Sequence, residues 1–251
     1  MAKIGKYLYG IVSENHDKPL NLEGIGPLKR PVGYLDYKDI SAVISDTLIT
    51  EYDPTKELLL GHERVIGILM KNSTIIPCRF GTVAQNKKSI MQMMEEHYES
   101  FVEQLEKVNN KVELGLIVSW KRDAYSKDIE TPEIRELKDK LVGKPERLIF
   151  EEKIELGKLV EAETEAKRKV YSDEILKTLD ELYVEHKVNE IMNIRMIFNG
   201  SFLVDRACEP DFDAAVGQLY QKYRSNMDFR YSGPWAPYNF VSITINQEDG
   251  E

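Results

Sequence analysis

The first half of the chain changes between short apolar runs and longer stretches with helical spacing, which predicts a mixture of strands and helices. Asp53-Pro54 predicts the start of one helix, with Asp53 as the N-cap and Pro54 in the first turn. A second helix is expected to begin at Lys88 and to end at Asn109-Asn110. The predicted buried stripes are Leu58, His62, Val65 and Leu69 in the first helix, and Ile90, Met94, Tyr98, Phe101, Leu105 and Val108 in the second. The predicted strands are 7–12, 34–37, 40–44 and 73–77.

The second half follows a different pattern. Residues 146–186 contain no proline and predict a helix of roughly 60 Å, which either breaks at Ser172 or projects from the body. Asn199-Gly200 predicts a two-residue hairpin turn. Pro210-Asp211 predicts the start of another helix. Strands are expected at 112–120, 194–198, 201–204 and 239–245, and a loop or short helix at 121–145.

This order of elements predicts an α+β protein of two domains. From residue 112 the order is strand, long helix, strand, strand, helix, strand, which is the split βαββαβ arrangement of a ferredoxin-like fold. The first half predicts a separate α+β unit. We expect domains at 1–109 and 110–251, with the boundary near Asn109-Asn110.

Composition narrows the class of protein. The net charge of −9 argues against a dedicated nucleic-acid binder, whose affinity would need a basic surface. Two cysteines 130 positions apart, Cys78 and Cys208, do not form a disulfide framework and fit a reducing cytoplasm. The N-terminus lacks the apolar run of a signal peptide, and no segment has the roughly 20 apolar residues of a membrane span. We therefore expect a cytosolic protein.

The sequence offers little sign of catalytic chemistry. His62-Glu63 begins like a zinc-protease motif, but Ile66 stands where the second histidine would be. No glycine-rich phosphate loop is present, and Cys78 has no marked base beside it, so a core thiol is the favoured interpretation. We expect no enzyme, metal or cofactor. The alternative is a ligand-binding regulator or an enzyme on a ferredoxin-like scaffold, with a pocket near Arg79.

For two features the sequence is compatible with either a structural or a binding role. Residues 231–241 hold four aromatic side chains around the turn signal Gly233-Pro234, so they form either a packed corner or a surface for a partner. A core position is favoured for Trp235 over an interface position. Arg79 is expected to be partly buried and paired with a helix carboxylate. The alternative for Arg79 is a contact with a partner or an anion.

Two segments resemble a known family. Residues 75–83, Ile-Ile-Pro-Cys-Arg-Phe-Gly-Thr-Val, resemble the Pro-x-Arg-Phe-Gly signature of the gas vesicle GvpF/GvpL proteins. Residues 231–241, Tyr-Ser-Gly-Pro-Trp-Ala-Pro-Tyr-Asn-Phe-Val, resemble their C-terminal signature, with Ala236 where many relatives have proline. Residues 7–12 and 199–204 also fit the family pattern, so the resemblance spans nearly the whole chain.

The resemblance implies a non-enzymatic accessory or minor structural protein of gas vesicles, the hollow protein shells that give buoyancy to aquatic microorganisms, and more specifically an F member. It implies two α+β domains, the second a modified ferredoxin-like domain. It also implies a location at the gas vesicle in the cytoplasm and contacts with the small hydrophobic shell protein and other accessory proteins during assembly. The candidate partner-binding or signature residues are Arg79, Phe80, Gly81, Tyr231, Gly233, Pro234, Trp235, Pro237 and Tyr238.

Overall fold

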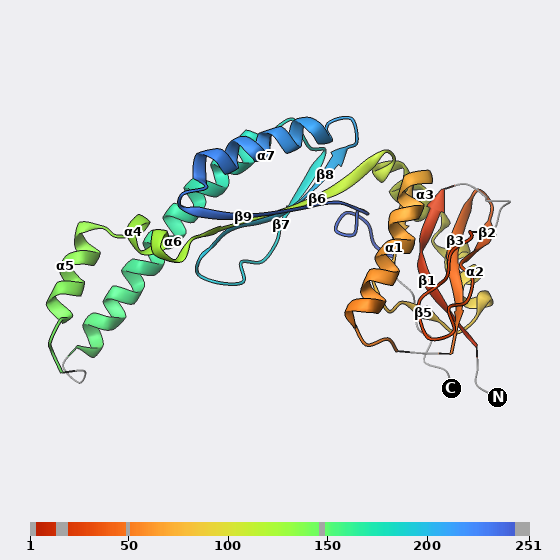
Figure 1. Ribbon diagram of the computed structural model, residues 1–251, viewed down its shortest axis with the longest axis horizontal. Helices are drawn as coiled ribbons and strands as arrows, with labels where there is room; N and C mark the ends of the chain where they lie inside the picture. The colour runs from red at the N-terminus through yellow and green to blue at the C-terminus, as the bar shows by residue number, and fades with distance from the viewer. Residues whose placement is uncertain (1–3, 14–19, 49–50, 146–148, 244–251) are drawn as a thin grey trace. The chain divides into compact units, whose positions relative to one another are not determined.

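The chain forms two units in a computed structural model, which describes residues 4–13, 20–48, 51–145 and 149–243 (Figure 1). The first unit holds the described residues up to Glu113 and again from Pro234 onward, and the second unit holds Leu114–Gly233. The chain passes from the first unit to the second after Glu113 and returns after Gly233. The domain bounds expected from the sequence, 1–109 and 110–251, stay a prediction.

The first unit is built on one sheet. Its strands are ordered β2-β3-β1-β4, and β5 pairs with β1. Strand β1 is antiparallel to β3, β4 and β5. The bounds are β1 Gly5–Ser13, β2 Gly33–Tyr37, β3 Ile40–Thr47, β4 Ile75–Pro77 and β5 Val83–Ala84, so all four strands predicted for this half are present.

A bulge in β1 decides which side chains face which helix. The register with β3 shifts between Leu8 and Gly10, so that Tyr9 has no direct partner. Tyr7 and Tyr9 therefore lie on one face, and Ile11 lies on the opposite face, although strict alternation would put it beside them.

The helices of the first unit cover both faces of the sheet. Helix α1 (Lys56–Asn72) has Thr55 as its N-cap instead of the expected Asp53, because the Thr55 hydroxyl accepts from the Leu58 amide. The helix expected at 88–108 is two helices, α2 (Lys87–Glu96) and α3 (Tyr98–Val108), which meet at the non-helical His97. The break lets both pieces pack apolar residues on the same core.

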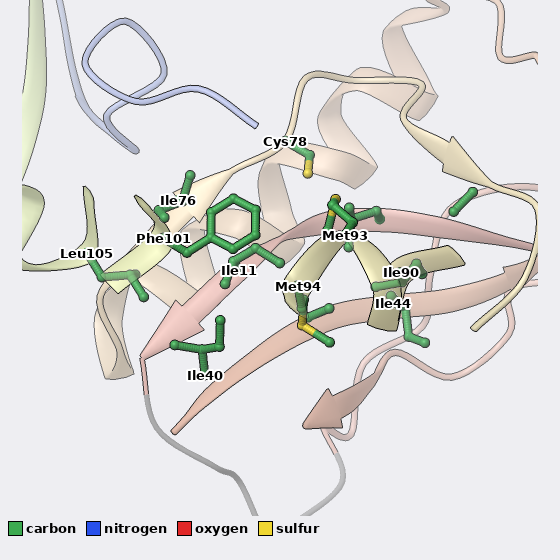
Figure 2. Packing of buried hydrophobic residues seen from close by; sticks show 13 residues of the cluster. Ile11, Ile40, Ile44, Ile76, Cys78, Ile90, Met93, Met94, Phe101 and Leu105 are labelled. Atoms are coloured by element: carbon green, nitrogen blue, oxygen red, sulfur yellow. The ribbon is translucent and has the colours of Figure 1, made fainter. Parts of the chain in front are cut away.

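The two faces bury separate apolar clusters. One cluster joins the sheet to α1 through Val65, Ile66 and Leu69. The other joins the sheet to α2 and α3, as Figure 2 shows. Its labelled members are Ile11, Ile40, Ile44, Ile76, Cys78, Ile90, Met93, Met94, Phe101 and Leu105. Each buried side chain of this size contributes about 1.5–3 kcal/mol to folding.

The second sheet has the ferredoxin-like topology that the sequence predicts. Its strand order is β7-β8-β6-β9. Strands β6 and β7 are separated by β8, and β8 and β9 by β6, so each βαβ unit is split by a strand of the other. Helices α4 and α5 are inserted before the long helix α6. The bounds are β6 Lys111–Trp120, α4 Arg122–Asp128, α5 Pro132–Leu141, α6 Phe150–Leu179, β7 Glu185–Val188, β8 Met196–Asp205, α7 Glu209–Tyr223 and β9 Met227–Trp235.

The predicted hairpin at Asn199-Gly200 is wrong. Strand β8 continues through both residues and pairs with β7, Val188 opposite Gly200. The glycine serves packing here, because a Cβ at Gly200 would lie 2.5 Å from the ring of Phe198. Helix α6 does not break at Ser172, whose hydroxyl donates to the Ile197 carbonyl.

The predicted end of the chain also differs. Strand β9 runs through Gly233-Pro234, where a turn was expected. Proline is tolerated because β9 is at the edge of its sheet, and Gly233 adopts φ of 131°. Residues 239–243, the described part of the predicted final strand, are not a strand. None of the described helices is both long and apolar enough to cross a membrane.

Candidate functional site

A buried histidine lies at the centre of the first unit. His62 of α1 is 1% exposed and has a hydroxyl at each ring nitrogen. The Tyr7 hydroxyl lies 2.9 Å from Nδ1, and the Tyr238 hydroxyl lies 3.2 Å from Nε2. Strand β1, helix α1 and the tail after β9 thus meet at one side chain.

The hydrogen bonds form a chain with one consistent direction. The Gly81 amide donates to the Tyr7 hydroxyl at 2.9 Å, and the Tyr7 hydroxyl can then donate to His62 Nδ1. The Tyr238 hydroxyl donates to Glu63 Oε1 at 2.9 Å, which leaves its oxygen to accept from His62 Nε2–H. This arrangement requires a neutral His62 with its proton on Nε2.

Electrostatics favour the same state. Burial lowers the pKa of His62 to about 4, and a hydrogen bond with the Cys78 backbone acts against it. Burial also raises the pKa of Tyr7 and of Tyr238, whose neighbour Glu63 raises it further. Burial raises the pKa of the Glu63 carboxyl, although the bond from Tyr238 acts against it.

Aromatic rings enclose the histidine. The His62 ring stacks on Tyr9 at 5.8 Å and meets the edge of Phe80 at 5.9 Å. Tyr9 is itself held by Ser45 at 3.1 Å and by the Ile25 amide at 2.9 Å. Among the described residues no buried side-chain nitrogen or oxygen lacks a hydrogen-bond partner. A fully paired and sealed network of this kind is suited to holding segments together.

The first signature segment divides at Arg79. Phe80 packs in the His62 cluster, and Gly81 turns the chain with φ of 84°, a conformation that favours glycine. The Arg79 side chain is exposed, and no carboxylate in the described part of the chain pairs with it. The expectation of a partly buried, ion-paired Arg79 is therefore wrong.

The second signature segment has a packed end. Ala236, Pro237 and Phe240 are buried, and Tyr238 bonds to the His62 cluster. The Asn239 amide donates to Glu113 Oε2 at 2.8 Å. This part of the segment forms the packed corner that was one of the two interpretations.

The other end of the same segment is exposed. Trp235 is 43% exposed, which contradicts the favoured core position. Tyr231 is 37% exposed and donates from its hydroxyl to Asp213 Oδ1 at 2.5 Å. Gly233 and Pro234 between them are exposed as well. The signature therefore combines a buried anchor, 236–240, with an exposed aromatic strand end, 231–235.

The described residues hold no group of three or more His, Cys, Asp or Glu side chains that could bind a metal. Cys78 is 2% exposed, and burial raises the pKa of its thiol, as a core thiol requires. The sequence placed His62 in a buried stripe but missed its partners Tyr7 and Glu63. The available signal was the tyrosine in an apolar strand, because a buried tyrosine hydroxyl needs a partner.

The comparisons with known proteins agree with the signature segments. The family model described as "Gas vesicle synthesis protein GvpL/GvpF" matches residues 5–242. The chain belongs to the GvpL/GvpF family. The gas vesicle protein F of Haloferax mediterranei is 26% identical to this family member over 246 residues, covering 96% of this chain and 95% of the relative. The gas vesicle protein F of Dolichospermum flosaquae is 27% identical, with 94% and 97% covered. The gas vesicle protein L1 of Halobacterium salinarum is 22% identical, with 94% and 90% covered.

Solved structures show the same fold. The crystal structure of the gas vesicle protein GvpF from Anabaena sp. PCC7120 matches with a TM-score of 0.83 at 24% identity, covering 96% of this chain and 99% of that chain. The GvpF structure from Microcystis aeruginosa matches with a TM-score of 0.80 at 24% identity, covering 94% and 98%. The α+β class of this GvpL/GvpF family member is thereby confirmed, and its role is related to gas vesicles.

Proposed function

We propose that this protein is a non-enzymatic accessory or minor structural protein that binds the gas vesicle shell protein and other accessory proteins during assembly, at the gas vesicle in the cytoplasm. Family membership across residues 5–242 supports the association with gas vesicles. The observation that carries the binding role is the exposure of Trp235, which directly precedes the buried residues Ala236 and Pro237.

An aromatic side chain exposed to water costs free energy that burial against a partner would recover. A tryptophan that is 43% exposed leaves apolar area in water, although the adjoining Ala236 is buried. Tryptophan, tyrosine and arginine are the residues that most often dominate the energy of protein interfaces. Trp235, with Tyr231 four residues before it on the same face of β9, offers such an anchor to an apolar shell subunit.

The test is co-purification with the shell protein. The affinity-tagged protein would be co-expressed with the shell protein, as wild type, as Trp235→Ala and as Leu60→Ala. Leu60 is 60% exposed on α1 and controls for the loss of any exposed apolar side chain. We expect Trp235→Ala to lower the recovered shell protein at least tenfold and Leu60→Ala to leave it unchanged. Equal recovery with wild type and Trp235→Ala, or none with wild type, would overturn the proposal.

The location has a separate test. Immunoblotting of isolated gas vesicles, before and after a wash with urea, measures whether the protein stays on the finished vesicle. We expect the protein in the vesicle fraction before the wash. Its absence from that fraction at all stages of vesicle growth would contradict a structural role.

A further inference from the structure

Strand β9 lies at an open edge of the second sheet. The strand order is β7-β8-β6-β9, so one side of β9 pairs with β6 and the other has no strand beside it in the described part of the chain. Within 227–231 only Met227 is buried, whereas Asp228, Arg230 and Tyr231 are exposed. An edge strand presents unpaired amide and carbonyl groups, which are a template for pairing with another chain.

The backbone groups at this edge belong to the odd-numbered residues. The Lys121 amide donates to the Asn226 carbonyl at 2.8 Å, so the backbone of Asn226 faces β6. Gly115 and Ser232 lie at equal distances along the two strands from this bond, and a Cβ on Gly115 would be 3.0 Å from Ser232 Oγ, which agrees with this register. Because alternate residues of a strand face opposite neighbours, residues 227, 229 and 231 direct their amide and carbonyl groups to the free edge.

Two charged side chains of this stretch lack ion-pair partners. Asp228 and Arg230 are both exposed, and neither makes an ion pair with any residue that the structure describes. They are two residues apart, so both project from the same face of β9. Charges on an edge strand usually prevent pairing with another chain. Here the two charges have opposite signs, so a strand with the reverse order of charges would neutralise both.

Helix α7 lies on the other face of β9 and leaves room for a second strand. Its Tyr220 meets the ring of Phe229 at 5.9 Å, and its Asp213 accepts a hydrogen bond from the Tyr231 hydroxyl. Residues 214–221 of α7 carry no charge, so they would not repel the same helix of a second copy. Tyr220 is 44% exposed beside this edge, and a strand added to β9 would cover it.

We propose that two copies of this chain associate through their β9 strands, which form an antiparallel pair about a two-fold axis at Phe229. In this register Asp228 of each copy lies opposite Arg230 of the other, and Met227 lies opposite Tyr231. The axis joins backbone groups that already point to the free edge. The Asp228–Arg230 pairs then occupy non-hydrogen-bonded positions, where opposite side chains lie closest. The two second sheets become one continuous sheet.

Charge and symmetry select this register. An axis at Asp228 or at Arg230 would place two like charges opposite each other, which is destabilising. An axis at Tyr231 would place Arg230 opposite Ser232 and leave both charges without a partner. Only the axis at Phe229 pairs each charge with its opposite, and a two-fold interface then contains both pairs.

The other edge of the sheet is less suited to self-association. Strand β7 also carries opposite charges two residues apart, Glu185 and Lys187, but it has only four residues. Both of these residues already take part in interactions within the chain. Lys187 therefore provides a control for a charge at an edge strand outside the proposed contact.

The inference goes beyond the proposed function, because it concerns self-association and not binding of the shell protein. The paired stretch ends at Tyr231. Trp235 lies four residues later, about 13 Å away along the strand at about 3.3 Å per residue. A variant at Trp235 can therefore lose shell-protein binding and keep the dimer.

The test is sedimentation equilibrium of the full-length protein over a wide range of concentrations. Each chain has a net charge of −9, so all runs use one salt concentration, because salt screens both this repulsion and the Asp228–Arg230 attraction. We expect wild type to form a reversible dimer. Asp228→Arg and Arg230→Asp each place like charges opposite each other and should weaken dimerisation at least tenfold. Circular dichroism checks that the variants are folded, as is expected for changes at exposed positions.

Combined variants identify the register. The double variant Asp228→Arg/Arg230→Asp exchanges the two charges and should dimerise like wild type. An equal mixture of the two single variants should form heterodimers, because each charge then meets its opposite. Lys187→Glu and Trp235→Ala should dimerise like wild type. A wild type that stays monomeric, single variants that dimerise like wild type, or a mixture that stays monomeric would overturn the proposal.

Discussion

The hydroxyl of Tyr238 donates to Oε1 of Glu63 at 2.9 Å, although the two residues are 175 positions apart. The bond ties the tail that follows β9 to helix α1 of the first unit. Through His62 and Tyr7 the same network reaches the amide of Gly81. The buried ends of the two family signatures are therefore parts of one hydrogen-bonded cluster.

The first prediction concerns the removal of the Tyr238 hydroxyl. Tyr238→Phe leaves His62 Nε2–H and Glu63 without their buried partner, so we expect a loss of about 1–3 kcal/mol in the free energy of unfolding. Urea denaturation, with hydrogen exchange of the β1 amides to report on the first unit, measures the loss. Tyr231→Phe removes an exposed hydroxyl bonded to Asp213 and should cost less than about 1 kcal/mol. Equal effects of the two variants would contradict the assigned role of the cluster.

The second prediction concerns pH. The pKa of His62 is about 4 in the folded protein and near 6.5 in the unfolded chain, so the unfolded chain binds the additional proton between these values. The stability of the first unit therefore falls as the pH drops from about 6.5 towards 4, by about 2 kcal/mol between pH 7 and pH 5. Glu63, with its raised pKa, acts in the opposite direction because protonation suits its folded state.

The pH effect can be isolated with one substitution. His62→Gln keeps a hydrogen-bonding side chain but does not titrate, so it should flatten the decline of stability between pH 7 and pH 5. Urea midpoints of both proteins across this range provide the comparison. Parallel declines for wild type and variant would show that His62 is not the titrating group.

The third prediction concerns the thiols. Cys78 is buried with a raised pKa, whereas Cys208 is only half-buried at the start of α7. In the native protein we expect one thiol to react with a disulfide reagent such as DTNB at least tenfold faster than the other, and Cys208→Ser to remove the fast phase. In urea both thiols should react at similar rates. A fast phase that survives in Cys208→Ser would place Cys78 at the surface.

The fourth prediction compares two glycines of the second unit. Gly200→Ala brings a Cβ to 2.5 Å from the buried Phe198 ring and should destabilise the unit by about 1–3 kcal/mol. Gly217→Ala, in an open position of α7, should stabilise it by about 0.5–1 kcal/mol. Thermal unfolding of the two variants gives the sign of each effect, and a stabilising Gly200→Ala would refute the packing explanation.

Much of the fold was predictable because the apolar pattern is local. The runs at 7–12 and 40–44 and the stripe at His62, Val65 and Leu69 appear where they were expected. The split βαββαβ order was also correct, although two of its strands were assigned to the wrong residues. Asn199-Gly200 has the local chemistry of a turn, but pairing with β7 and the space needed by Phe198 keep the strand straight. Such requirements are set by residues distant in sequence.

The candidate site was predictable only in part. The two signature segments were identified from the sequence. The difference in exposure between the halves of each segment was not, because it depends on contacts with residues far away in the sequence. Tyr238 is held by His62 and Glu63, far away in sequence, whereas Trp235, three residues earlier, has no such partner among the described residues and stays exposed. The interpretation as a packed corner is thus correct for residues 236–240, whereas a binding surface at residues 231–235 stays a prediction.

The measurement that most directly tests the proposed division of the signature is shell-protein binding and unfolding stability in the same preparations of wild type, Trp235→Ala and Tyr238→Phe. We predict that Trp235→Ala keeps its stability within about 0.5 kcal/mol and loses binding at least tenfold. Tyr238→Phe should lose stability and keep its binding at a temperature where it is folded. Full binding by Trp235→Ala, together with loss of binding by folded Tyr238→Phe, would contradict the account. It would indicate that shell-protein binding depends on the buried His62 cluster and not on Trp235.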